Sequence, residues 1–117
     1  MTAVNTAQDS LWETVCNIKD LIPNSGICAL VNGEQVAIFS LPGEMPGIYA
    51  LSNWDPIGEA NVMSRGIVGS IGDELVVASP LYKEHFNLTS GQCLEKPEHS
   101  LKVYPIKLEG DKVQIQT

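Results

Sequence analysis

Residues 53–93 carry the sequence NWDPIGEANVMSRGIVGSIGDELVVASPLYKEHFNLTSGQC, in which two proline turns interrupt runs typical of β-strands. The first turn is DPI at residues 55–57, and the second is SPLY at residues 79–82. Both turns stand where a metal site would fit, yet neither carries a pair of metal ligands. The stretch therefore raises the question of what two such turns do without a metal.

The rest of the chain repeats this pattern of short apolar or alternating runs separated by turn residues, without a sustained helical period. The clearest local signal is Asn32-Gly33 within residues 27–39, because a type I′ hairpin turn needs positive φ at both central positions. Gly72-Asp73 and Gly110-Asp111 predict two further hairpins. About ten short strands are expected, which predicts an all-β fold, an antiparallel sandwich or small barrel.

Length and charge limit the possible organisation and partners. The 117 residues suffice for one modest core, so we expect a single domain over residues 11–117 after a flexible N-terminus at residues 1–10. A net charge of −7 is opposite to what nucleic-acid binding requires. No apolar run approaches the roughly 18 residues of a membrane span, and the N-terminus does not resemble a secretory signal. We therefore expect a cytoplasmic protein without nucleic-acid or membrane partners.

The cysteines and histidines do not suggest a metal site. Cys16, Cys28 and Cys93 have no Cys-x-x-Cys spacing, and His85 and His99 are far apart. We expect Cys16 and Cys28 to be buried because they lie in apolar runs, and Cys93 to be more exposed because it follows a turn.

The order of turns and strands resembles the Rieske-type [2Fe-2S] domain across about residues 12–116. That family has a C-P-H tip, a C-P-x-H tip and then an F-[DN]-x-x-x-G strand and turn. Here DPI stands at the first tip and SPLY at the second, and FNLTSG follows at residues 86–91. The resemblance implies a Rieske-like antiparallel sandwich with the two tips adjacent at one end.

The four positions at which that family carries cluster ligands hold Asp55, Ile57, Ser79 and Tyr82. A Rieske centre needs two thiolates on one iron and two imidazoles on the other. Carboxylate and hydroxyl oxygens are hard donors, and isoleucine has no donor. The resemblance therefore implies a chain without a cluster, and we expect no metal, cofactor or catalytic residue on it.

Among Rieske-like chains without ligands, this sequence is similar to the small subunits of bacterial assimilatory NADH-dependent nitrite reductases. The similarity rests on four segments, ICALVNGEQVAIF, YALSNWDPIGEANVMSRGIV, GDELVVASPLYKEHFNLTSGQCLE and VYPIKLEGDKVQI. It implies a non-catalytic subunit that binds and supports a large subunit. The large subunit is expected to carry FAD, siroheme and an iron–sulfur cluster and to reduce nitrite to ammonia.

Apolar side chains near the tips would have no cofactor to pack on, so they are candidates for an exposed patch that binds the large subunit. The candidates are Trp54, Val62, Met63 and Leu81. For Ile57 and Tyr82 two interpretations stay open, because they could join this patch or pack between the tips in place of a cluster.

Three functions stay open on the sequence. The first is the non-catalytic subunit of a nitrite reductase, and the second is a free-standing interaction module of another oxidoreductase. The third, a [2Fe-2S] ferredoxin that carries electrons, conflicts with the missing ligands.

Overall fold

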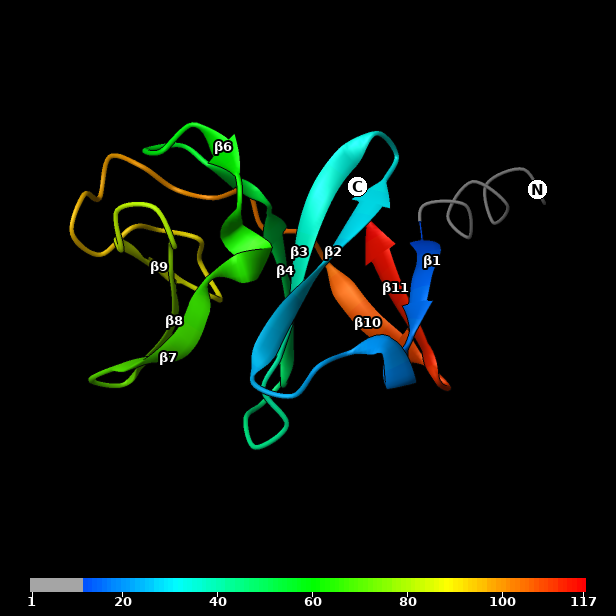
Figure 1. Ribbon diagram of the computed structural model, residues 1–117. Helices are drawn as coiled ribbons and strands as arrows, with labels where there is room; N and C mark the ends of the chain where they lie inside the picture. The colour runs from blue at the N-terminus through cyan, green and yellow to red at the C-terminus, as the bar shows by residue number, and fades with distance from the viewer. Residues whose placement is uncertain (1–11) are drawn as a thin grey trace, which may run out of the picture.

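The computed structural model describes residues 12–117 as antiparallel β-sheets with two short 3₁₀ helices (Figure 1). The expected flexible N-terminus at residues 1–10 lies outside the described residues. In chain order the elements are β1 (Trp12–Asn17), η1 (Ile18–Asp20), β2 (Ser25–Val31), β3 (Glu34–Ser40), β4 (Ile48–Ser52), β5 (Trp54–Asp55), β6 (Ala60–Asn61), η2 (Met63–Arg65), β7 (Ile67–Ile71), β8 (Glu74–Ala78), β9 (His85–Asn87), β10 (Ile106–Glu109) and β11 (Lys112–Gln116).

The sheet β2–β3–β4 lies in the middle of the molecule and is covered on both faces (Figure 1). Phe39 of β3 belongs to a first core with Val77 and Phe86 from the sheet β7–β8–β9. Ile38, its neighbour in β3, belongs to a second core with Ile115 of β11. Successive side chains of a strand point to opposite faces, so the part of a strand that lies between two cores is apolar on both faces rather than alternating. This position explains the apolar run at residues 36–39 of β3.

The three predicted hairpins are confirmed. Asn32 and Gly33, between β2 and β3, have φ of 52° and 82°, as a type I′ turn requires. Gly72, between β7 and β8, and Gly110, between β10 and β11, also have positive φ, 60° and 64°. The turn residues alone therefore suffice to predict these three pairs of antiparallel strands.

The third sheet, β1–β11–β10, joins the two ends of the described chain. β1 pairs antiparallel with β11, and Cys16 lies opposite Val113. Pro105 directly precedes β10, which is an edge strand, as expected for a residue that cannot donate to a sheet ladder. None of the helices in residues 12–117 is long and apolar enough to cross a membrane.

Asn53 attaches the first tip to the central sheet. Its buried side chain donates from Nδ2 to Gln35 Oε1 at 3.1 Å and accepts from the Ser64 N–H at 2.7 Å. Its backbone N–H donates to the Gln35 carbonyl, and its carbonyl accepts from the Met63 N–H. Asn53 thereby holds η2 against β3 and fixes where the tip begins.

Candidate functional site

The two proline tips meet through a side-chain hydrogen bond. Asp55 ends β5 and Ser79 follows β8, and both side chains are buried. Ser79 Oγ donates to Asp55 Oδ2 at 2.5 Å. The prediction that the two tips are adjacent is therefore confirmed.

Each member of this pair also supports its own turn. Asp55 Oδ1 accepts from the N–H groups of Ile57 and Gly58, at 2.8 and 3.0 Å. Ser79 Oγ accepts from the Leu81 N–H at 3.2 Å. Short polar side chains commonly bind backbone groups two or three residues on. Here the same two side chains shape both turns and join them, so the buried oxygens have hydrogen-bond partners.

Leu81 of the second tip packs over Gly58 of the first. A Cβ atom added to Gly58 would lie 2.4 Å from Leu81 Cδ1 and 3.0 Å from Asp55 Oδ2. A side chain at position 58 would therefore force the end of the half-exposed Leu81 side chain to move.

Ile57 and Tyr82 could either join an exposed patch or pack between the tips, and the structure gives a different answer for each residue. Ile57 is half-buried and packs against the first core, so it fills space between the tips and the sheets. Tyr82 is 67% exposed and fills no interior volume.

The residues at the tips do not fit the [2Fe-2S] cluster that the fold family implies. Asp55 and Ser79 bind each other, and neither is a thiolate. Ile57 has no atom that could bind iron. Tyr82 has a phenol in place of the imidazole that a Rieske centre needs, and it is largely exposed to solvent. Among residues 12–117 no group of three or more His, Cys, Asp or Glu side chains could hold a metal ion.

Of the four candidates for partner binding, the structure leaves two well exposed. Trp54 is 44% and Leu81 is 43% exposed, whereas Val62 is half-buried. The expectation that Met63 is exposed is wrong, because it is fully buried in the first core. The reason is that η2 turns back under β2 and β3, where the flexible methionine side chain fills the core.

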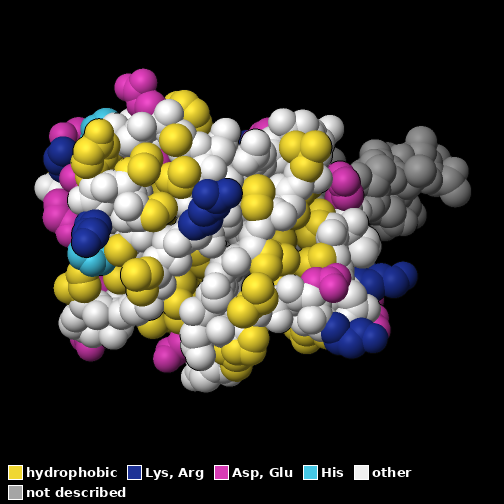
Figure 2. Space-filling model, in the orientation of Figure 1, with side chains coloured by type: hydrophobic (Ala, Val, Ile, Leu, Met, Phe, Trp, Pro, Cys, Tyr) yellow, Lys and Arg dark blue, Asp and Glu magenta, His cyan; other side chains and the backbone are white. Residues whose placement is uncertain are grey.

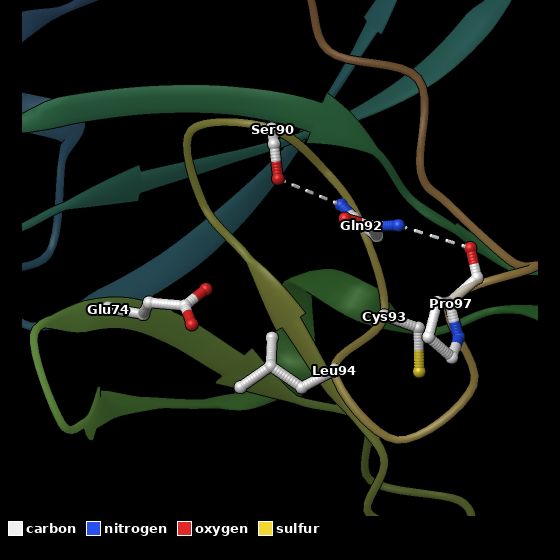
Figure 3. Close-up of a pocket in the computed structure, with 6 residues that line it drawn as sticks. All are labelled: Glu74, Ser90, Gln92, Cys93, Leu94 and Pro97. Carbon is white, nitrogen blue, oxygen red and sulfur yellow. Dashed lines mark hydrogen bonds between the residues drawn. The ribbon is translucent and has the colours of Figure 1, made fainter.

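The expected exposures of Cys28 and Cys93 are also wrong. Cys28 is exposed because it points away from the face on which its neighbours Ile27 and Ala29 pack against the second core. Cys93 is buried, and burial raises the pKa of its thiol above the ordinary value. Cys93 lines a pocket of about 330 Å³ together with Glu74, Ser90, Gln92, Leu94 and Pro97, whose side chains are drawn in Figure 3.

Beside the second tip lies a recess of about 410 Å³ that the sequence did not predict. We call it the second-tip recess. It is lined by Arg65, Ile67, Ala78, Ser79, Pro80, Lys83 and His85. Five of these residues lie in the stretch 78–85 that contains the second tip, and the pairing of β7 with β8 brings Arg65 and Ile67 to it.

The comparison with known proteins places these features in a family. A family model described as the Rieske-like [2Fe-2S] domain matches residues 11–116. The nitrite reductase (NADH) small subunit of Salmonella typhimurium is 44% identical over 107 residues, which cover 92% of this chain and 98% of that protein. The solution NMR structure of the nitrite reductase [NAD(P)H] small subunit from Erwinia carotovora has a TM-score of 0.76 at 44% identity, covering 92% of this chain and 82% of that one.

Two further matches extend this comparison. The ferredoxin of carbazole 1,9a-dioxygenase from Nocardioides aromaticivorans has a TM-score of 0.77 over 90% of this chain and 96% of its own, and its 19% identity shows the fold alone. The nitrite reductase [NAD(P)H] large subunit of Klebsiella oxytoca is 36% identical over 104 residues, which cover 89% of this chain but 11% of that protein. The chain belongs to the Rieske-like [2Fe-2S] domain family and, within it, to the group of nitrite reductase small subunits.

Proposed function

We propose that this chain is the non-catalytic small subunit of a cytoplasmic NADH-dependent nitrite reductase and that it binds and supports the large subunit. The observation that carries this proposal is the closed pair of tips. Ser79 and Asp55 are joined by a hydrogen bond of 2.5 Å, and Leu81 packs on Gly58. These contacts fill the place where the family fold would hold a cluster.

This arrangement argues against an electron carrier. A [2Fe-2S] centre needs four soft or imidazole donors at the tips, and the chain offers two mutually bonded oxygens there. The proposed function therefore keeps FAD, siroheme and the iron–sulfur cluster on the large subunit. This chain contributes a folded surface.

The Klebsiella oxytoca match supports the large subunit as the partner. A segment that is 36% identical to this chain forms part of one polypeptide named as a large subunit. A domain joined covalently to a larger protein in one organism is expected to bind the equivalent protein as a separate chain in another. This observation favours the nitrite reductase subunit over a free-standing module of another oxidoreductase.

We place the contact surface at the end of the fold that carries the tips. Trp54 and Leu81 are large apolar side chains that remain about half exposed there, and Tyr82 beside Leu81 is more exposed still. Tryptophan and tyrosine are enriched at protein interfaces. Because hydrogen bonds already fix both tips, little ordering of the backbone should be needed on binding.

Co-expression tests this proposal. The chain would be produced with a tag beside the large subunit of the same organism, purified, and analysed by size-exclusion chromatography. We expect a complex with both chains, and NADH-dependent reduction of nitrite to ammonium by that complex. The absence of a complex at micromolar concentrations, or a Rieske-type spectrum from the isolated chain, would overturn the proposal.

A further inference from the structure

The second-tip recess combines apolar walls with three basic side chains. Ile67, Ala78 and Pro80 supply apolar surface, and Arg65, Lys83 and His85 supply the basic groups. Ile67 is 78% exposed, which is high for a branched apolar side chain. Figure 2 shows hydrophobic side chains spread over the part of this face where β6 to β9 lie, with basic side chains between them.

The positive charge in this recess is largely unneutralised. Within residues 12–117 neither Arg65 nor Lys83 forms an ion pair, although Lys96 pairs with Glu84 and Lys102 with Glu34. His85 differs, because its Nδ1 lies 2.6 Å from Glu95 Oε2. On a chain with net charge −7, two unpaired cations beside one recess form a local positive site.

Lys83 occupies this site at a conformational cost. Its φ is +66°, a region in which side chains other than Gly, Asn and Asp are uncommon. The turn over residues 79–83 holds it there, through a hydrogen bond of 3.0 Å from the Lys83 N–H to the Ser79 carbonyl. Glycine would satisfy this turn with less strain, so the turn itself gives no reason for a lysine.

We propose that the second-tip recess accepts a carboxylate side chain of the large subunit, flanked by apolar side chains that pack on Ile67 and Pro80. This inference rests on the proposed function and adds the chemistry of the partner. A guanidinium can bind a carboxylate through two parallel hydrogen bonds, and Lys83 would add a second cation. Charge complementarity with the recess therefore selects an acidic residue within an apolar segment.

The experiment measures the affinity of the full-length chain for the large subunit by biolayer interferometry at several salt concentrations. Arg65→Gln and Lys83→Gln remove one charge each, and the double variant removes both. We expect the double variant to bind at least about tenfold more weakly at low ionic strength, with a smaller loss at high salt. Lys112→Gln is the matched control, because Lys112 is exposed on β11, forms no ion pair in the described chain and does not line the recess.

A further variant, Lys83→Gly, separates folding from binding. We expect its melting temperature to equal or exceed that of the wild type, because glycine relieves the positive φ, while its affinity for the large subunit falls. Wild-type affinity in Lys83→Gly and in the double variant would overturn the inference while leaving the proposed function in place.

Two other results are distinguishable. If the wild-type chain forms no complex with the large subunit, the proposed function fails and the inference fails with it. Calorimetry with sodium nitrite tests a small-anion site. Saturable nitrite binding that is lost in the double variant, with wild-type affinity for the large subunit, would assign the recess to a small anion and overturn the inference.

Discussion

Ser79 and Asp55, 24 positions apart in the chain, are joined by a buried hydrogen bond of 2.5 Å that connects the two tips. The family resemblance places cluster-binding cysteines at these two positions. Here a hydroxyl and a carboxylate bind each other directly, and each also accepts backbone N–H groups of its own turn. The two tips are thus joined by a direct side-chain hydrogen bond instead of a shared metal cluster.

Ser79→Ala should destabilise the fold. It would leave Asp55 Oδ2 buried without this donor, which costs roughly 1–3 kcal/mol of unfolding free energy. Urea denaturation followed by tryptophan fluorescence measures the loss. Ser70→Ala on the exposed surface of β7 is the control and should change stability little. Equal stability of the two variants would mean that the bond between the tips contributes nothing.

Gly58→Ala should disturb the contact between the tips. The added Cβ would lie 2.4 Å from Leu81 Cδ1, so the half-exposed Leu81 side chain must move, and the cost should not exceed the roughly 1–3 kcal/mol of overpacking in a closed core. Gly69→Ala is the control, because a Cβ there meets no atom within 4 Å. In the double variant Gly58→Ala/Leu81→Ala the penalty should be partly relieved, and a double-mutant cycle measures this coupling. Strictly additive effects would show that Leu81 is not the obstacle.

The sequence predicted the hairpins but not the burial of several single side chains. Asn32-Gly33 determines its turn locally, so neighbouring residues suffice to predict it. The burial of Met63 depends on η2 folding back under β2 and β3, which are distant in sequence. Cys93 is buried where its backbone forms a β-bridge with Phe86 and its N–H donates to the His99 carbonyl. The residue pattern around Cys93 predicts neither contact.

For the functional site, the tips and their missing ligands could be identified from the sequence. The second-tip recess could not, because Arg65 and Ile67 reach the stretch 78–85 only through the pairing of β7 with β8. The positive φ of Lys83 also has no sequence signature, since lysine gives no indication of that conformation.

Anaerobic reconstitution with iron and sulfide should give a colourless protein. The positions Asp55, Ile57, Ser79 and Tyr82 supply neither thiolate nor imidazole, so a stable cluster is not expected. Visible absorption, electron paramagnetic resonance and iron analysis measure the outcome, with a Rieske ferredoxin treated in parallel as the positive control. A Rieske-type signal with stoichiometric iron would contradict the donor argument.

Stability should depend on pH through Glu34 and Tyr104. The Tyr104 hydroxyl donates to the Glu34 carboxylate, and this bond, with that from Lys102, lowers the pKa of Glu34 below its ordinary 4.5. Burial and the bond to Glu34 raise the pKa of Tyr104 above its ordinary 10. The stabilisation from Glu34 is therefore complete above pH 4.5 and lost as pH falls through its folded-state pKa. The stabilisation from Tyr104 is lost as pH rises above 10.

Tyr104→Phe tests this dependence. The difference in unfolding free energy between the wild type and this variant should be largest near neutral pH and should shrink towards pH 3, which urea denaturation can measure. Tyr82→Phe is the control, because Tyr82 is largely exposed and its hydroxyl forms no hydrogen bond within the described residues. A difference for Tyr104→Phe that is the same at pH 3 and pH 7 would contradict this assignment.

Trp54→Ala should weaken binding to the large subunit without unfolding the chain. Backbone contacts hold Trp54 in place. Its backbone N–H donates to Ser52 Oγ at 3.1 Å, and it pairs with Asn61 of β6. Trp54 is 44% exposed at the proposed contact surface. Because tryptophan is a common interface hot spot, we expect affinity to fall at least about tenfold.

Salt dependence separates this effect from that of the second-tip recess. Loss of apolar contact at Trp54 should persist at high salt, whereas loss of charge at Arg65 and Lys83 should matter less there because salt screens it. Leu30→Ala is the control, since Leu30 is 71% exposed on the edge strand β2 and belongs to neither tip. If Leu30→Ala weakens the complex while Trp54→Ala binds as the wild type does, the large subunit contacts the β2–β3 hairpin instead of the tips.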